Sequence, residues 1–533
     1  MIMRTKSSTC ITLFVVITLI FKLSSTAFGQ SEYQPYSFDF NQKFSAELYS
    51  TQTRILSSNK TNFIDDTLLK HTYDSIMNAH PAQNRLLNQH LIEVKGNGNT
   101  FYGDVLPDFE IGHDFSGSKS VWTTSLGAQV GGTLGTKFTY YASFYANRAA
   151  LPDYVVDNIN GTGYIPGQGM DRSQGNAIKN WDYTTFDFSY TPIKYINFTL
   201  GKDKTFIGDG YRSLMLSDFA SNYPFFKLTA TIGNVRYMSM YAYMDNPATP
   251  TVPYGPQIGK WAYFQYIEWN ITKRFSLGFF ENVMEGARDA DGLKQGFNPS
   301  LASPFVFLVP SDNIDNNPAK NLLGLNGKLK VFNKAIIYGQ FVLNEFHAKD
   351  FYSGDGSVTN KSGYQIGFRG ADMFNITGFN YLAEFNTARP FTYSSFDQTS
   401  NYSQNGQPLA DPFGANFREF LGILNYSVGR FDFKAEGDYA LFGLDIDGLD
   451  YGQNIFEPYT NAAKQLGNYI GQGLKTNFYY AEGTVDYIVN PKYNLRIELG
   501  GMYRDEKNAD GDLKTPVLIF GIKSSFREIY SDF

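Results

Sequence analysis

The residues with the clearest capacity for chemistry lie in one stretch, positions 201–228, with the sequence GKDKTFIGDGYRSLMLSDFASNYPFFKL. Two loop glycines, Gly208 and Gly210, flank Asp209 and allow a backbone path that larger residues would resist. Arg212 follows two positions later, so a carboxylate and a guanidinium are held close together in the chain. The spacing predicts an ordered loop that carries a binding group.

The polar groups of this loop have two interpretations. In the first, Arg212 lies inside the protein and pairs with Asp209 or Asp218, which makes a structural clasp. In the second, the planar guanidinium holds the carboxylate of an acidic sugar, while Tyr211 or Phe206 stacks on the face of the sugar ring. Both interpretations can hold at once.

The long segment before this loop, residues 149–181, supplies further candidate binding groups. Tyr164 and Trp181 offer aromatic faces, and the run YIPGQGMDR combines rigid turns with hydrogen-bonding side chains. Carbohydrate sites use these residue types, and so do ordinary packed loops. The run GTGYIPGQG lacks the G-x-G-x-x-G spacing and the strand-to-helix context of a phosphate-binding loop, which argues against a nucleotide site.

Cysteine and histidine usage argues against catalysis and against metal sites. The single cysteine, Cys10, lies in the N-terminal leader, so the mature chain offers neither disulfides nor thiol chemistry nor cysteine-ligated zinc. The three histidines between residues 71 and 90 are nine and ten positions apart and do not share a helical face. His113 and His347 have no G-x-S-x-G motif and no serine beside them. We therefore predict a non-enzymatic protein without metal or another cofactor.

The charge pattern argues against nucleic acid as a partner. Removal of the leader leaves 42 basic residues against 51 acidic ones. Acidic turns near 289–292, 445–450 and 508–512 lack the twelve-residue calcium pattern with its terminal glutamate. That absence favours solvated turns over calcium sites.

The N-terminus is typical of a secretory signal peptide. Arg4 and Lys6 precede an apolar run at residues 10–21, and Ala27-Phe28-Gly29 supplies small residues for cleavage. We assign residues 1–29 to this signal, which implies export. After residue 29 no stretch of eighteen apolar residues occurs, which excludes helical membrane spans.

Beyond about residue 104 the chain alternates between apolar and polar residues with period two. Phe431, Phe433 and Tyr439, for example, alternate with charged residues such as Asp432 and Lys434. Aromatic residues make up 17% of the chain, which is the composition of a sheet. We predict eighteen strands, near 104–114, 120–131, 135–146, 182–191, 194–203, 223–232, 234–245, 259–270, 273–284, 321–332, 334–345, 361–370, 374–386, 416–428, 430–441, 474–488, 492–504 and 515–527.

The connections between these segments alternate tight turns with long loops such as 204–222 and 387–415. Membrane barrels have short periplasmic turns and long external loops, and an even strand number returns the chain to the periplasmic side. The final strand leads to Phe533, and a terminal aromatic resembles the insertion signal of outer-membrane barrels. The predicted fold class is therefore all-β: residues 104–533 form an antiparallel transmembrane β-barrel in the cell outer membrane.

Residues 30–103 are the least sheet-like part of the chain. Asp65 or Asp66 could cap a first short helix, and Pro81 could open a second one. We expect this segment to form a small, partly helical periplasmic cap.

The run Gly208-Asp209-Gly210-Tyr211-Arg212-Ser213, followed by Leu216-Ser217-Asp218 and preceded by YIPGQGMDR, carries a family resemblance. It resembles the Wzi-type capsule-assembly family of Gram-negative outer-membrane proteins, in particular its RemB-like, Bacteroidota-type branch. The resemblance covers most of the mature chain in layout. It implies a non-catalytic protein that binds surface polysaccharide and assists capsule assembly or attachment, whereas the RemB-like branch implies a part in gliding motility and adhesion.

We expect the external mouth of the barrel to bind cell-surface polysaccharide above a lumen filled by inward loops. The candidate ligand-binding residues are Phe206, Asp209, Tyr211, Arg212, Asp218, Tyr164 and Trp181, supported by the loop glycines Gly208 and Gly210. Two alternatives stay open: a substrate-specific outer-membrane channel, and an accessory protein of gliding motility or surface adhesion. The expected partners are outer-membrane lipid, surface polysaccharide and envelope or motility proteins.

Overall fold

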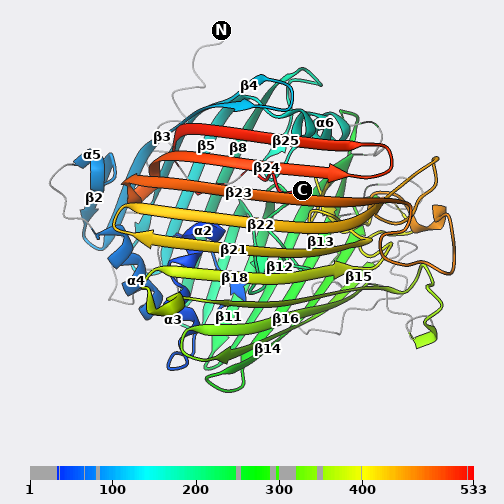
Figure 1. Ribbon diagram of the computed structural model, residues 1–533. Helices are drawn as coiled ribbons and strands as arrows, with labels where there is room; N and C mark the ends of the chain where they lie inside the picture. The colour runs from blue at the N-terminus through cyan, green and yellow to red at the C-terminus, as the bar shows by residue number, and fades with distance from the viewer. Residues whose placement is uncertain are drawn as a thin grey trace, which may run out of the picture.

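The chain forms a closed antiparallel barrel of eighteen strands, seen from the side in Figure 1. This computed structural model describes residues 33–533 except 35, 65, 80–84, 248–251, 253, 289–293, 295, 299–319, 345–351, 398, 525 and 528. In chain order the barrel strands are β3 (Asn99–Asp114), β4 (Lys119–Leu134), β5 (Phe138–Ala150), β8 (Ile178–Ile193), β9 (Ile196–Asp203), β11 (Tyr223–Ile232), β12 (Val235–Pro247), β13 (Gln257–Asn270), β14 (Phe275–Gly286), β15 (Lys320–Val331), β16 (Ala335–Asn344), β17 (Lys361–Gly370), β18 (Phe379–Ala388), β21 (Phe417–Val428), β22 (Phe431–Leu444), β23 (Leu474–Asn490), β24 (Leu495–Lys507) and β25 (Asp512–Lys523).

All eighteen predicted strands are confirmed, because alternation over ten or more residues leaves a strand no second choice of buried face. The barrel closes where residues 517–522 of β25 pair with residues 109–114 of β3. Several strand ends differ from the prediction by a few residues; β18, for example, begins at Phe379 rather than at residue 374. β3 begins at Asn99 rather than at residue 104, and its first residues pair with the short strand β2 (Ile92–Gly96). β25 ends at Lys523 rather than at residue 527.

The two faces of the wall differ as the alternation predicts. On β22, Phe431 and Phe433 are exposed on the outside, whereas Glu436 and Asp438 are buried on the inside. An apolar outer face on a sheet without edges is the form in which β-strands cross the outer membrane. The chain is therefore an outer-membrane β-barrel. None of the helices in the part of the chain that the structure describes is long and apolar enough to cross a membrane.

The two ends of the barrel are also different. Tight turns of two to eight residues, such as 233–234 and 371–378, lie at one end, together with the N-terminal helices (Figure 1, left). Long loops lie at the other end, among them 151–177, which contains helix α6 (Asp153–Thr162), 389–416 and 445–473. We call these ends the short-turn end and the long-loop end.

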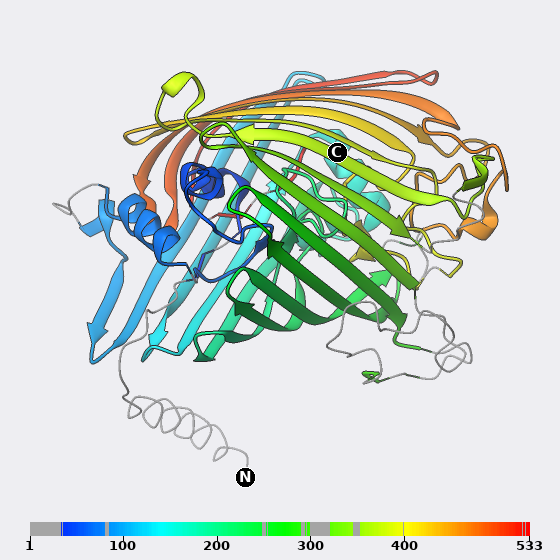
Figure 2. The ribbon, with the colours of Figure 1, turned by 90° about the horizontal axis from the view of Figure 1, so that it is seen from below.

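The N-terminal segment extends into the lumen and is not confined to a cap at its mouth (Figure 2). Tyr33 stacks on Tyr141 of β5 at 3.8 Å between ring centroids, and its hydroxyl donates to Asp203 of β9. The predicted cap of the first long helix is confirmed, since the Asp66 carboxylate accepts two backbone N–H groups of that helix. Pro81, expected to open the second helix, and residues 1–29 lie outside the described residues. The segment contains α2 (Phe38–Gln42), α3 (Ser45–Tyr49), β1 (Asn59–Lys60), α4 (Thr67–Met77) and α5 (Arg85–Asn88).

The C-terminal residues after β25 also turn into the lumen, so the expected terminal strand is wrong beyond Lys523. Phe526 packs edge-on against Phe40 of α2 at 4.8 Å, and the Arg527 guanidinium donates to Asp108 of β3. The terminal Phe533 ring lies 5.9 Å from that of Tyr154 in α6. For these residues, interactions with the inner wall are more favourable than continued pairing of β25, because buried charges of the wall need a counter-charge. We call residues 524–533 the C-terminal tail.

Candidate functional site

Loop 204–222 lies inside the barrel and is held by inward-facing polar side chains of successive wall strands. Gln340 of β16 accepts the backbone N–H of Leu214, and Gln365 of β17 donates to the Arg212 carbonyl. Arg369 of β17 donates to the Asp209 carbonyl at 2.7 Å. The period-two pattern of the strands thus supplies the donors and acceptors that a loop buried in a lumen requires.

Asp209 is the first charged anchor of the loop and is completely buried. Its carboxylate lies 2.9 Å from the Lys328 ammonium of β15 and accepts the hydroxyl of Ser58 at 2.6 Å. Burial alone would raise the pKa of Asp209, but Lys328 and Lys60 outweigh burial and lower that pKa to about 2. Asp209 is therefore an ionised strut between the loop, the N-terminal segment and the wall.

Arg212 is the second anchor, and its acidic partners are not the predicted ones. Its guanidinium lies 2.9 Å from Glu419 of β21, 3.8 Å from Asp438 of β22 and 3.0 Å from Asp532 of the C-terminal tail. The sequence favoured Asp209 or Asp218, but Asp209 pairs with Lys328 and Asp218 accepts the Tyr530 hydroxyl. Only 3% of Arg212 is exposed, so the clasp forms and the guanidinium does not reach the external mouth.

Glu384 of β18 explains why a glycine precedes Tyr211. Its carboxylate accepts the backbone N–H groups of Tyr211 and Arg212, both at 3.1 Å. A Cβ added at Gly210 would lie 2.0 Å from that carboxylate. The predicted need for glycine in this loop thus has a steric origin at Gly210.

We predict that Gly210→Ala will displace the loop and lower the free energy of unfolding by roughly 1–3 kcal/mol, as overpacking of a buried site does. Gly437→Ala on β22 is the matched control, because a Cβ there meets no atom within 4 Å. The measurement is urea unfolding in detergent micelles, followed by tryptophan fluorescence. Equal midpoints for the two variants would contradict the steric role of Gly210.

Tyr211 joins the Arg212 cluster, since its hydroxyl donates to Asp532 at 2.8 Å. The other predicted aromatic residues and Asp218 lie at separate places and do not form one site with Arg212. Phe206 stacks on Tyr36 at 5.0 Å, and the Tyr164 hydroxyl donates to Gln257 of β13. Asp218 accepts the Tyr530 hydroxyl of the tail, and burial raises the pKa of Asp218 despite the opposing effect of Lys204. Trp181 packs with α6 in a small apolar cluster. These side chains hold the lumen closed.

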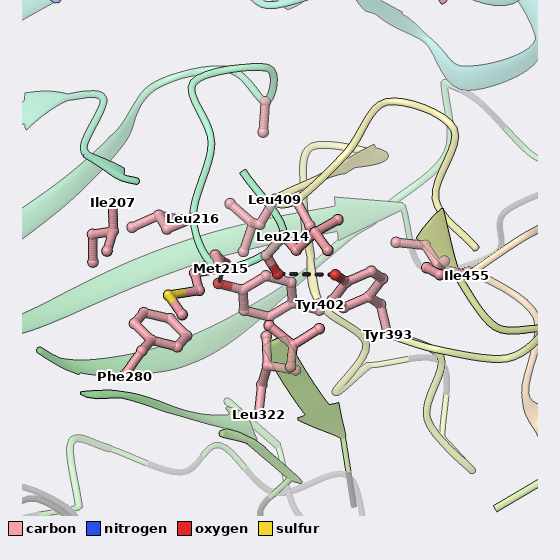
Figure 3. Packing of buried hydrophobic residues seen from close by; sticks show 14 of the residues in the cluster. Ile207, Leu214, Met215, Leu216, Phe280, Leu322, Tyr393, Tyr402, Leu409 and Ile455 are labelled. Atoms are coloured by element: carbon pink, nitrogen blue, oxygen red, sulfur yellow. Dashed lines mark hydrogen bonds between the residues drawn. The ribbon is translucent and has the colours of Figure 1, made fainter. Parts of the chain in front are cut away.

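An apolar plug completes the closure toward the long-loop end (Figure 3). Leu214, Met215 and Leu216 of loop 204–222 meet Tyr393, Tyr402 and Leu409 of loop 389–416. The Tyr393 hydroxyl donates to the Leu214 carbonyl at 2.9 Å, and the Tyr402 hydroxyl donates to that of Met215. Two external loops are thereby fastened together inside the barrel.

A cavity of about 280 Å³ remains between the tail, the N-terminal segment and the wall from β21 to β3. Its wall carries paired charges, including Arg496 with Glu498 at 3.1 Å and Lys523 with Glu110 at 2.7 Å. The strand pattern predicted inward-facing charges of this kind but not their partners. Period-two alternation indicates which face of the sheet a side chain occupies, and it does not indicate which residue that side chain contacts.

The long-loop end presents one ordered exposed surface, which we call the outer-loop platform and define as residues 352–360 and 459–470. Three backbone hydrogen bonds join its halves, from Gly467 to the Asp355 carbonyl at 2.8 Å, from Asn468 to the Gly356 carbonyl at 2.9 Å and from Val358 to the Gln465 carbonyl at 3.1 Å. Tyr352 and Tyr469 are 79% and 60% exposed on it. Sequence analysis missed this surface, since these tyrosines lie in loops without a distinctive motif.

No family model and no curated protein sequence matches the chain. Among solved structures it is similar to Wzi of Escherichia coli, described as a carbohydrate-binding β-barrel involved in group 1 capsule assembly. That likeness has a TM-score of 0.57 at 12% identity and covers 93% of this chain and 100% of Wzi. OprD of Pseudomonas aeruginosa has a TM-score of 0.42 at 9% identity, covering 79% of this chain and 94% of that one. OccAB2 of Acinetobacter baumannii has a TM-score of 0.44 at 9% identity, covering 80% of this chain and 99% of that one. The likeness to Wzi shows a shared fold.

Proposed function

We propose that this outer-membrane barrel binds cell-surface polysaccharide at the outer-loop platform, without catalysis, and so assists capsule assembly or attachment. The carrying observation is the pair of exposed tyrosines on a hydrogen-bonded loop surface. Tyrosine rings stack on the apolar faces of sugars, and their hydroxyls bond to sugar hydroxyls. The fold shared with a barrel described as carbohydrate-binding supports the same proposal.

The neighbouring polar groups suit a sugar ligand. Asn461, Lys464 and Gln465 are exposed on the same platform, and the Lys464 ammonium lies 5.9 Å from the ring centre of Tyr469. Amide and ammonium donors are thus available near the aromatic surface. The backbone bonds to residues 355 and 356 fix this arrangement before a ligand arrives, which lowers the entropy cost of binding.

The charges near the platform favour a neutral polysaccharide over an acidic one. Asp355, Asp445 and Asp447 are exposed at this end, whereas Arg212, the expected carboxylate clamp, is buried and paired. Like charges would repel an acidic chain from such a surface. The proposed ligand class is therefore a neutral glycan.

The filled lumen argues against the channel alternative. The described parts of loops 204–222 and 389–416 pack together inside the barrel, and both the N-terminal segment and the C-terminal tail occupy the space below them. A passive pore requires a continuous aqueous path through the barrel. In such a pore the inward-facing polar side chains of the wall would contact water rather than the segments that fill the lumen.

The test is binding of neutral glycans, on an array and as purified polysaccharide, to the Tyr352→Ala/Tyr469→Ala variant. We expect about tenfold weaker binding, because each lost stacking contact is worth roughly 0.5–1.5 kcal/mol. Tyr195→Ala, a 44% exposed tyrosine at the short-turn end, is the control and should bind as the unaltered protein does. Unchanged binding by the double variant would remove the platform from the site.

A further inference from the structure

Charge is distributed unevenly between the two ends of the barrel. The nine connections at the long-loop end contain 19 acidic and 8 basic residues, whereas the eight tight turns at the other end contain seven basic residues and one acidic residue, Asp372. The seven are Lys137, Lys194, Lys273, Arg274, Lys334, Arg430 and Lys492. The acidic excess of the whole chain thus lies at one end, and the opposite end is basic.

Four of these bases, Lys137, Lys194, Lys273 and Arg274, are exposed, and we call them the basic rim. Within the described part of the chain, none of the four has an acidic side chain within ion-pair distance. Lys334 differs, because it pairs with Asp372 at 2.5 Å. The rim therefore presents positive charge that the protein itself does not neutralise.

Exposed apolar side chains lie at the tips of the same set of turns. Phe332 is 80% exposed, Phe374 is 77% exposed and Ile232, at the end of β11, is 69% exposed. Both phenylalanines adopt positive φ values, 52° and 55°, which bulky residues seldom do. The Lys194 ammonium also lies 4.8 Å from the ring centre of the exposed Tyr195. Apolar and aromatic groups beside ammonium groups are typical of a membrane interface.

We propose that the short-turn end of the barrel binds anionic phospholipid headgroups through the basic rim. Lysine ammonium and arginine guanidinium groups attract lipid phosphates, and several such residues together favour anionic over zwitterionic lipid. The exposed aromatic and aliphatic side chains of the turns would contact the glycerol and upper acyl region of the same lipids. By the predicted topology, this leaflet is the periplasmic one.

The proposal concerns one end of the barrel only. At the long-loop end, exposed bases such as Lys119 and Lys514 are paired with Asp153 and Asp512. Removal of four bases from the long-loop end changes the net charge of the protein as much as removal of the basic rim does, but it leaves the rim itself intact. This difference supplies a matched control.

The experiment uses the full-length mature protein in detergent, incubated with equal amounts of dioleoyl phosphatidylglycerol and dioleoyl phosphatidylcholine, with bound lipid read by native mass spectrometry. The rim variant is Lys137→Gln/Lys194→Gln/Lys273→Gln/Arg274→Gln. The control variant is Lys119→Gln/Arg172→Gln/Lys507→Gln/Lys514→Gln, which removes the same charge from the long-loop end. Heat-modifiable migration on gels verifies that each variant is a folded barrel.

We expect the unaltered protein and the control variant to retain phosphatidylglycerol preferentially, and the rim variant to lose this preference at least about tenfold. Equal preference in all three proteins, or an equal loss in both variants, would overturn the proposal. Millimolar inorganic phosphate should leave the bound lipid in place. Displacement by inorganic phosphate alone would show a phosphate site rather than a lipid site and would equally overturn it.

Discussion

Replacement of Arg212 by methionine should lower the free energy of unfolding by about 3–5 kcal/mol, because it leaves buried carboxylates without their counter-charge. Arg212 lies between Glu419 and Asp438 of the wall and Asp532 of the C-terminal tail, all almost completely buried. The measurement is urea unfolding in detergent micelles. Arg212→Lys should recover little of the loss, since one ammonium cannot satisfy three carboxylates placed around a planar fork.

Arg172→Met is the control for this prediction. Arg172 pairs with Asp182 at 2.6 Å, but its side chain is 66% exposed, so the loss should stay below about 1 kcal/mol. If Arg212→Met also lowers the free energy of unfolding by less than about 1 kcal/mol, the ion cluster does not have the proposed structural role. The folded Arg212→Met protein should still bind glycan. Loss of glycan binding would instead indicate a direct contact between Arg212 and the ligand.

Removal of the C-terminal tail, by a stop after Lys523, should cost still more stability, roughly 5 kcal/mol or above. Two buried pairs break at once, Arg527 with Asp108 and Asp532 with Arg212. The Arg504 guanidinium also loses the carbonyl of Phe533, to which it donates at 3.0 Å. The readout is the temperature at which the folded, fast-migrating form disappears on gels.

Asp532→Asn tests the same contact in a chain of full length, should the shortened barrel fail to assemble. It keeps the shape of the side chain and removes the charge that faces Arg212, so the transition temperature should fall by several degrees. Asp510→Asn, in the exposed loop between β24 and β25, is the matched substitution and should leave that temperature unchanged. Identical temperatures for both variants would show that the tail does not stabilise the lumen.

Not all of the candidate site was accessible from sequence. The glycines and charges of residues 208–212 identified an ordered loop correctly, because such a loop needs unusual residues close together in the chain. Their partners lie 117 to 320 residues away along the chain, on strands, on the N-terminal segment and on the tail. No local pattern encodes those pairs, and so the expected partners of Arg212 were wrong.

The sequence by itself determined the barrel, its eighteen strands and the two kinds of connection, because side-chain alternation is a local property that closure of the sheet merely completes. Only the tertiary structure decided what fills the lumen. The inner wall offers buried charges, and the groups that neutralise them come from distant parts of the chain: Asp209 and Arg212 from loop 204–222, and Arg527 from the C-terminal tail. Which segments meet depends on geometry across the lumen, and strand periodicity carries no information about that distance.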